Sequence, residues 1–385
     1  MPTIRRIKPE QYDITNALSE YAFQYKLDEA TKQKRFELWH EQDIWGDFEG
    51  NTMISKLHVY PLQLWINGES YEMGGVAAVA TWPEHRRKQS VSRLLTHSLA
   101  YMMEKGQTIS LLHPFKVSFY RKFGWELFVD QKWYTLSLEN LHPMQPANGT
   151  IARFPHKEAI YSMQHIYRQF ATRYNGTLNR SDKWLERQFI KEGTYTAVYT
   201  NHHGDQTGYL VARVRDEKMT VTEWVALDQD ARRGLWNFIC QHDSMVKEIE
   251  MVMTADDTLA FEITNPIFTQ KTVPYFMARI VDVEAFFSKY IAQTSESAPV
   301  TLTVEDPYAP WNEGNWRIEG KSIVKVPSGE TSELEVDIQT LSALALGYIT
   351  AEQAHDQGRL RGERLACQKF ARYLTTRQTA FLDYF

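Results

Sequence analysis

The feature that most constrains the fold is a strand, a basic turn and a helix that follow one another directly. Small and β-branched residues at 76–81 predict a buried strand, which Pro83 ends. Basic residues at 86–88 form the turn, and the apolar spacing of 93–103 predicts an amphipathic helix that Gly106 ends. The first N–H groups of a helix have no partner inside it and attract anions. The segment predicts a phosphate-binding turn, although an ordinary turn with solvated arginines fits the residues as well.

A tyrosine motif follows this helix. Residues 108–114 predict a second short strand, and the motif F-Y-x-x-F-G-W occupies 119–125. Strand, basic turn, helix, strand and tyrosine motif, in this order and spacing, resemble the GNAT acetyltransferases. The resemblance implies that the turn holds the pyrophosphate of acetyl-CoA and that the first strand offers backbone N–H groups to the thioester carbonyl. It also implies that the tyrosine lies near the sulfur.

Length and composition limit the class of protein. A chain of 385 residues suggests two or three domains, and 43% hydrophobic residues predict packed globular ones. No apolar run approaches the roughly 20 residues that a membrane span needs, and the first residues lack the apolar core of a signal peptide. Cys240 and Cys367 have neither metal nor redox spacing, so we expect a cytoplasmic protein. A net charge of −5 gives no reason to expect nucleic-acid binding.

The chain divides into three blocks, predicted at 1–140, 141–278 and 279–385. A stretch containing Pro and Asn separates the first two. The second block repeats the strand and helix patterns of the first without a clear phosphate turn. Its one basic turn carries Asp228 and Asp230 where a pyrophosphate would lie, and like charges repel there. We expect Asp228 to cap the following helix instead.

The end of the chain carries a narrower resemblance. The third block has the pattern D-P-x-A-P-W-N-x-G-x-W-R at 306–317, then a helix capped by Asp337 and stopped by Gly347, and it ends in F-L-D-Y-F at 381–385. With the first block, these motifs resemble the enhanced intracellular survival (Eis) family of N-acetyltransferases over essentially the whole chain. The resemblance implies an α/β (α+β) fold: tandem GNAT-like domains, only the first with a cofactor site, then a C-terminal sterol-carrier-protein-like α+β domain. It also implies a homo-hexamer.

The resemblance assigns two catalytic groups. The tyrosine of the motif, Tyr120, would be the acid that protonates the departing thiolate, and the terminal carboxylate of Phe385 would be the base or would position the amine. A tyrosine is neutral at pH 7 and can donate a proton, whereas a carboxylate is a poor base unless it is desolvated or acts through a water. A core tyrosine and a buried aromatic chain end are the structural alternatives.

The resemblance also assigns a cofactor site, with one departure. The usual turn has glycine where this chain has Gln89, and glycine permits close backbone approach and positive φ. We expect binding to survive because helical φ suits Gln at a helix N-terminus, but a requirement for positive φ would disable the site. The cofactor-binding residues implied are Val79, Thr81, Arg86, Arg87, Lys88, Gln89, Ser90 and Val91.

The sequence gives weaker signals for the residues that would bind the acceptor amine. Two segments at 21–27 and 35–39 fall where GNAT proteins place substrate-covering helices. An aromatic and acidic lining would suit a cationic amine. The ordinary alternative is that the aromatic pair is the buried stripe of an amphipathic helix. The candidate acceptor-binding residues are Asp28, Glu29, Phe36, Glu37 and Trp39.

We therefore expect an acetyl-CoA-dependent N-acetyltransferase in which a primary amine attacks directly in a ternary complex. Aminoglycosides, polyamines and lysine-type amines are candidate acceptors. A non-catalytic ligand-binding protein with a degenerate turn at Gln89 is the alternative, and a longer acyl-CoA is a third possibility. No metal is expected, because the sequence His202-His203-Gly204-Asp205 lies between two strands and predicts a polar hairpin turn.

Overall fold

The computed structural model describes residues 2–154, 156–189, 191–291, 298–327 and 329–385. The strands are β1 (Pro2–Arg6), β2 (Asp43–Glu49), β3 (Thr52–Ile66), β4 (Glu69–Thr81), β5 (Ile109–Leu112), β6 (Glu126–Ser137), β7 (Thr150–Phe154), β8 (Thr194–Thr200), β9 (Gln206–Arg215), β10 (Lys218–Ala226), β11 (Glu248–Thr254), β12 (Thr269–Ile280), β13 (Val300–Glu305), β14 (Gly314–Glu319), β15 (Ser322–Val326), β16 (Leu334–Asp337) and β17 (Leu360–Gly362). The helices are α1 (Tyr12–Phe23), α2 (Glu29–Glu37), α3 (Ser90–Glu104), α4 (Val117–Arg121), α5 (His156–Ala171), α6 (Asp182–Phe189), α7 (Gln229–Cys240), α8 (Leu259–Glu262), α9 (Val283–Ile291), α10 (Ile338–Leu346), α11 (Ala351–Asp356) and α12 (Arg364–Ala371).

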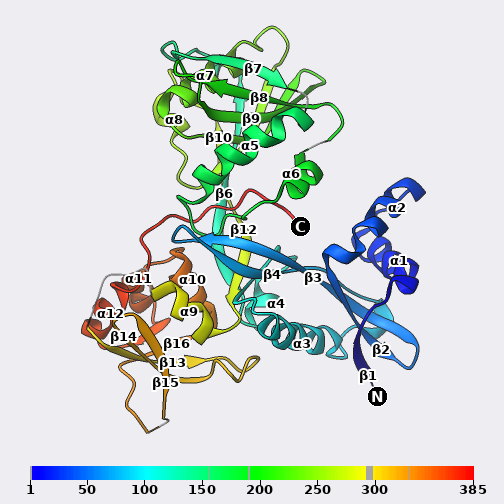
Figure 1. Cartoon of the computed structure of the whole chain (residues 1–385), viewed down its shortest axis with the longest axis vertical. Helices are drawn as coiled ribbons and strands as arrows, with labels where there is room; N and C mark the ends of the chain where they lie inside the picture. The colour runs from blue at the N-terminus through cyan, green and yellow to red at the C-terminus, as the bar shows by residue number, and fades with distance from the viewer. Residues whose placement is uncertain (1, 155, 190, 292–297, 328) are drawn as a thin grey trace.

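One twelve-stranded sheet runs through the first two thirds of the chain, in the order β1-β2-β3-β4-β5-β12-β6-β11-β10-β9-β8-β7. The long strands β6 and β12 join its two halves, as Figure 1 shows. β12 returns from the second half to pair with β5 along 277–280, and β6 pairs with β11 at its other edge. The sequence analysis did not identify β12, and the block boundary drawn at 278 falls within this strand.

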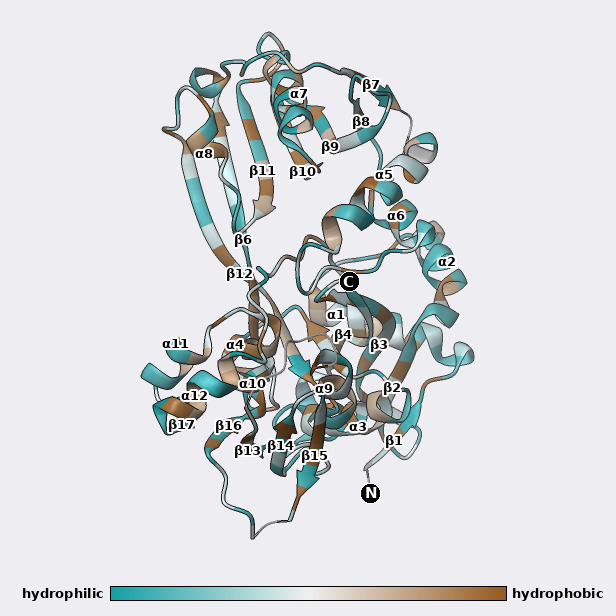
Figure 2. Ribbon diagram, turned by 60° about the vertical axis from the view of Figure 1, so that its left-hand side comes forward, coloured by the Kyte–Doolittle hydropathy of each residue, from teal (hydrophilic) through white to brown (hydrophobic). Residues whose placement is uncertain are grey.

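The strand, turn and helix predicted between residues 76 and 106 form as expected. β4 ends at Thr81, a short 3-10 turn follows at Pro83–His85, and α3 begins at Ser90. α3 buries one face, on which Leu95 and Leu99 have no solvent exposure. Strands β8 to β11 belong to the second half of the sheet. Buried and half-buried residues alternate along β11, and Figure 2 shows the hydropathy of these strands.

The third block forms a separate five-stranded sheet, in the order β15-β14-β13-β16-β17, with α9 to α12 packed around it. The D-P-x-A-P-W-N motif fixes this block to the end of β12. Its Asp306 accepts two hydrogen bonds from the buried Arg279 at 2.6 and 2.7 Å, and Asn312 donates to the same carboxylate at 2.9 Å. The helix expected after Asp337 is α10, where Asp337 accepts from a backbone N–H and Gly347 adopts a φ of 87°.

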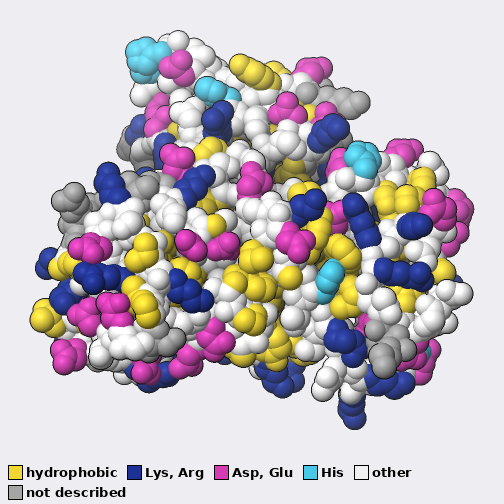
Figure 3. Space-filling view, turned by 60° about the horizontal axis from the view of Figure 1, so that its bottom comes forward, with side chains coloured by type: hydrophobic (Ala, Val, Ile, Leu, Met, Phe, Trp, Pro, Cys, Tyr) yellow, Lys and Arg dark blue, Asp and Glu magenta, His cyan; other side chains and the backbone are white. Residues whose placement is uncertain are grey.

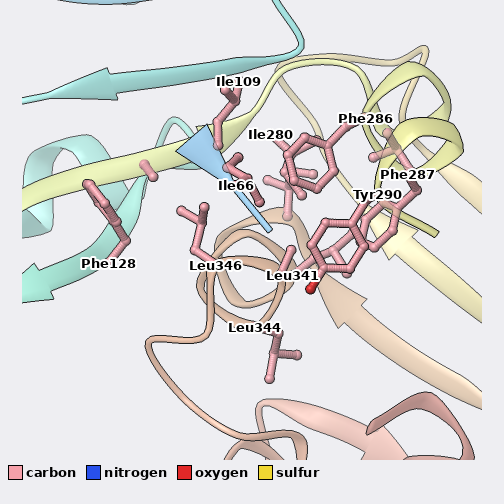
Figure 4. Close-up of a cluster of buried hydrophobic side chains, with 14 of the residues drawn as sticks. Ile66, Ile109, Phe128, Ile280, Phe286, Phe287, Tyr290, Leu341, Leu344 and Leu346 are labelled. Carbon is pink, nitrogen blue, oxygen red and sulfur yellow. The ribbon is translucent and has the colours of Figure 1, made fainter. Parts of the chain in front are cut away.

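A shared hydrophobic core holds the first and third blocks together. Figure 4 shows Ile109 of β5 and Ile280 of β12 beside Phe286 of α9 and Leu341 of α10. These side chains are 0% exposed, so the interface is packed like the interior of a domain. On the face drawn in Figure 3, positive and negative side chains are intermixed, and hydrophobic ones gather near its middle. Within the described residues, no helix combines the length and apolar character that crossing a membrane requires.

The last residues of the chain leave the third block and return to the junction of the two sheet halves (Figure 1). Asp383 is fully buried and accepts hydrogen bonds from Arg180 at 2.9 Å and from the Trp184 indole at 2.7 Å. Arg180 also donates to Glu223 at 2.6 Å. The Tyr275 hydroxyl donates to the Asp383 carbonyl at 2.8 Å. We call Arg180, Trp184, Glu223 and Asp383 the tail clamp.

The clamp predicts a measurable effect on the tail. Asp383→Asn leaves Arg180 facing one carboxylate instead of two in a site closed to water. We expect it to lower the free energy of unfolding by about 3 kcal/mol and to speed release of Phe385 by carboxypeptidase. Asp356→Asn, at an exposed aspartate, is the matched control. Equal stability and equal release rates in the two variants would show that the clamp does not hold the tail.

Candidate active site

A cavity of about 800 Å³ opens beside β4 in the first half of the sheet. Four parts of the chain form its wall: helices α1 and α2, strands β3 and β4, the segment from His113 to Tyr120, and the last two residues, with Arg187 and Gln188 of α6 at the rim. Segments more than 350 residues apart in sequence therefore meet at one site.

β4 separates from its neighbour at this cavity. Its parallel pairing with β5 ends at Val76 and Leu112, so the following β4 residues have no partner on that side. A bulge lies there as well, because two β4 residues stand opposite one β3 residue between the pairs Lys56–Ala80 and His58–Ala77. Ala78 in the bulge has a φ of 49°. Backbone groups without a β5 partner thus face the cavity beside Val79, on the strand from which the family resemblance implies N–H groups for a thioester carbonyl.

Tyr120 lies in the wall of the cavity at the C-terminal end of α4. The side chain is 4% exposed and packs edge-on against Phe115 and Phe119. Its hydroxyl makes no hydrogen bond with any residue that the structure describes. Burial raises the pKa of this phenol well above its ordinary value, because the phenolate would lose its hydration. The group therefore stays protonated at neutral pH.

Phe385 reaches the same cavity within its own subunit. The ring packs on Gly75, where a Cβ atom would come within 2.7 Å of it, and against Phe276 with ring centres 5.2 Å apart. A side chain at position 75 would displace the ring, so the absence of a side chain at Gly75 leaves the space that the Phe385 ring occupies. The terminal carboxylate forms no ion pair with any described side chain.

Of the predicted cofactor residues, Val79 is among the described residues that line the cavity, whereas Thr81 and residues 86–91, in the basic turn and at the start of α3, are not. Arg86, Arg87 and Lys88 are exposed, and the first N–H groups of α3 lack intrahelical partners. A buried aspartate that sequence reasoning missed fixes this turn: Asp47 of β2 accepts from the hydroxyl of Ser90 and from Arg93, both at 2.5 Å. Nothing in the local sequence distinguishes Asp47 from other strand residues.

Gln89 does not have the helical φ that we expected. It caps α3 with a φ of 61° and a ψ of 12°, the left-handed conformation that glycine adopts without strain. Arg87 has a φ of 65° as well. A non-glycine residue pays roughly 1–2 kcal/mol for this conformation. The turn therefore keeps a backbone shape typical of glycine at some cost in stability.

The five predicted acceptor residues lie elsewhere. Phe36 and Trp39 pack edge-on against Tyr12, with ring centres 5.1 and 5.7 Å away. Asp28 caps α2, and Glu29 pairs with Lys32. Neither these four nor Glu37 is among the described residues that line the cavity, so the acidic lining expected from the sequence is not found.

The cavity instead has basic side chains that the sequence analysis did not single out. Lys56 donates to Ser19 at 2.6 Å and contacts Nε2 of His58 at 2.9 Å, and His58 Nδ1 in turn contacts Gln42 at 2.8 Å. Burial, with Arg35 nearby, lowers the pKa of Lys56 to about 7. Burial also lowers the pKa of His58, which remains neutral. The spacing of Lys56 and His58 on one face of β3 was the only signal available from sequence.

The two segments set aside earlier behave as expected. Asp228 caps α7 and accepts from the Ala231 N–H at 2.7 Å. His202 and His203 lie in the turn that joins β8 to β9. Among the described residues, no three His, Cys, Asp or Glu side chains gather as metal ligands would.

Comparison with known proteins matches three parts of the chain to domain families. Residues 3–128 and 176–280 match acetyltransferase (GNAT) domain families, and residues 283–382 match the sterol carrier protein domain. An uncharacterized N-acetyltransferase of Streptomyces avermitilis is 21% identical over 339 residues, which cover 82% of each chain. A protein of Enterococcus faecalis V583, described as a probable N-acyltransferase, is 29% identical with a TM-score of 0.94 over both whole chains. Eis1 of Mycobacterium abscessus has the same fold, with 21% identity and a TM-score of 0.83 over both whole chains.

The turn geometry predicts the effect of restoring glycine. Because Gln89 already has the backbone shape of a glycine, Gln89→Gly should change the dissociation constant for acetyl-CoA by less than about threefold, the equivalent of about 0.7 kcal/mol. Titration calorimetry measures this constant, and Glu84→Gln in the preceding turn is the control. Tightening by tenfold or more would mean that the glutamine impairs the turn.

The environment of Lys56 predicts a pH dependence of stability. Its pKa is about 7 in the folded chain and 10.5 when unperturbed, so the unfolded chain binds more protons between these values. The free energy of unfolding should rise over this range by up to about 1.4 kcal/mol per pH unit relative to Lys56→Met. Urea unfolding at pH 7 to 9 tests this, with exposed Lys321→Met as control. A constant difference between wild type and Lys56→Met would refute the pKa shift.

Proposed function

Since the chain is an acyltransferase of the GNAT N-acetyltransferase type, with two such domains and a sterol carrier protein domain, we propose that it transfers acetyl from acetyl-CoA to a primary amine. The single observation that carries this proposal is the cavity where the separated part of β4, Tyr120 and the end of the chain meet. Acetyltransferases of this type use acetyl-CoA.

The cofactor side of the proposal uses the turn and β4. The pyrophosphate would lie on the N–H groups at the start of α3, with Arg86, Arg87 and Lys88 supplying positive charge. The thioester carbonyl would accept from backbone groups at Val79. The hydroxyl of Thr81 is buried without a hydrogen-bond partner among the described residues, which fits a group that waits for a ligand.

The chemical step follows from the groups that face the cavity. The amine nitrogen attacks the thioester carbon, the carbon–sulfur bond breaks, and the departing sulfur takes the proton of the Tyr120 hydroxyl. The carboxylate of Phe385 accepts the amine proton, directly or through water, or holds the amine in line. Direct attack needs no enzyme thiol. Cys240 and Cys367 support this, because both are buried outside the cavity and burial raises the pKa of each.

The ligand-binding alternative starts from Gln89. The positive φ that we expected to disable the site is present at this position, but Gln89 adopts it, so the turn keeps the backbone shape of a glycine. The choice of acyl chain and the homo-hexamer remain predictions from the family resemblance. Release of CoA across a panel of amines tests the enzyme proposal directly, because a binding protein would release none.

Tyr120→Phe separates the acid from the binding site. Removal of the proton donor should lower turnover on the order of 100-fold while the affinity for acetyl-CoA changes little. Steady-state CoA release and calorimetry give the two quantities. Tyr21→Phe removes a hydroxyl from an exposed tyrosine outside the cavity and should leave both unchanged. Wild-type turnover in Tyr120→Phe would show that Tyr120 is not the acid.

A further inference from the structure

The ionisable side chains of the cavity carry mostly positive charge. Arg35, Lys56 and Arg187 line it, together with the neutral His58. No Asp or Glu side chain is among the described residues of the wall, so its one carboxylate is the terminal group of Phe385. An acetyltransferase of cationic amines would need the opposite balance of charge.

Two of these cations have no carboxylate partner in the part of the chain that the structure describes. Arg187 pairs with Glu41 at 3.3 Å. Arg35 donates to the hydroxyl of Tyr25 at 2.9 Å and lies over the ring of the same residue. Lys56 contacts only Ser19 and His58, and its side chain is nearly fully buried. Arg35 is exposed, so the lack of a partner costs it little. Lys56 is a buried cation without a counter-charge, which is costly, and such groups are normally paired.

We propose that the acceptor amine also carries an oxyanionic group, a carboxylate or a phosphate, which Arg35 and Lys56 hold while the amine meets Tyr120 and the terminal carboxylate. This inference rests on the proposed acetyl transfer and names its substrate class. Among the acceptors considered from the sequence, it favours lysine-type amines that carry a carboxylate over aminoglycosides and polyamines, whose several ammonium groups these cations would repel.

The geometry gives the two cations distinct roles. The planar guanidinium of Arg35 presents paired N–H groups that match the two oxygens of an oxyanion. The ammonium of Lys56 is held in the cavity wall by hydrogen bonds to Ser19 and to His58, and His58 is in turn hydrogen-bonded to Gln42. Burial already lowers the pKa of Lys56, and an anion beside it would raise that pKa again. Binding of the acceptor would then be accompanied by proton uptake near neutral pH.

Three amines of equal length provide the test. 5-Aminopentanoate, pentylamine and 1,5-diaminopentane share a primary amine and a similar chain, and at the other end they carry a carboxylate, a methyl group and a second amine, which is an ammonium at neutral pH. 3-Aminopropyl phosphate extends the series to a phosphate. CoA release at saturating acetyl-CoA gives kcat/KM for each, and we expect 5-aminopentanoate or the phosphate to exceed the other two by tenfold or more.

Variants connect this preference to the residues. Arg35→Gln and Lys56→Met should each reduce kcat/KM for the anionic acceptor about tenfold or more, through KM, and should leave pentylamine nearly unaffected. Lys34→Gln, at the neighbouring exposed position of α2, is the matched control and should preserve the preference. The affinity of each variant for acetyl-CoA shows that its fold is intact.

The possible outcomes distinguish a failure of the anionic-acceptor proposal from a failure of the proposed acetyl transfer. Equal or faster turnover of 1,5-diaminopentane or pentylamine overturns the inference and leaves acetyl transfer standing. An anionic preference that survives in both variants overturns the assignment to Arg35 and Lys56. If no amine in a broad panel releases CoA, the proposed function fails, and the inference fails with it.

Discussion

The candidate site depends on one buried ionic contact, between Arg180 and Asp383. Asp383 lies two residues before the end of the chain, and the clamp holds it against the central domain. Without such a contact, the last residues of a chain are usually poorly ordered. Arg180 also pairs with Glu223, so two carboxylates share one guanidinium in a site closed to water. This arrangement fixes the position of the terminal carboxylate and completes the cavity wall.

Contacts between distant parts of the chain also join the three domains into one unit. β12 leaves the central domain and enters the first half of the sheet between β5 and β6. Near its end, Arg279 anchors the third domain through Asp306. The third domain then sends the tail back to the junction of the two sheet halves. Its contribution to the proposed chemistry is therefore positional, since it delivers a carboxylate to a cavity that the first domain builds.

Local patterns predicted the local structure well. The strand, turn and helix at the proposed cofactor site, the cap at Asp228 and the helix between Asp337 and Gly347 all follow from short-range rules. Long-range contacts were not predictable from one sequence. β12 looks like any strand, and its place between β5 and β6 depends on tertiary pairing. The acidic acceptor lining failed for the same reason, because helix spacing does not reveal which face meets the cavity, and Lys56 comes from a strand across it.

Removal of Phe385 alone tests the central claim, that the chain end takes part in catalysis within its own subunit. The deletion moves the terminal carboxylate back by one residue, about 3.5 Å, while Phe385→Ala keeps the carboxylate and loses only the ring. We predict that the deletion lowers turnover at least tenfold more than Phe385→Ala, with acetyl-CoA affinity unchanged in both. Full activity in the deletion variant would contradict the account, and Tyr120 would then have to act without the tail.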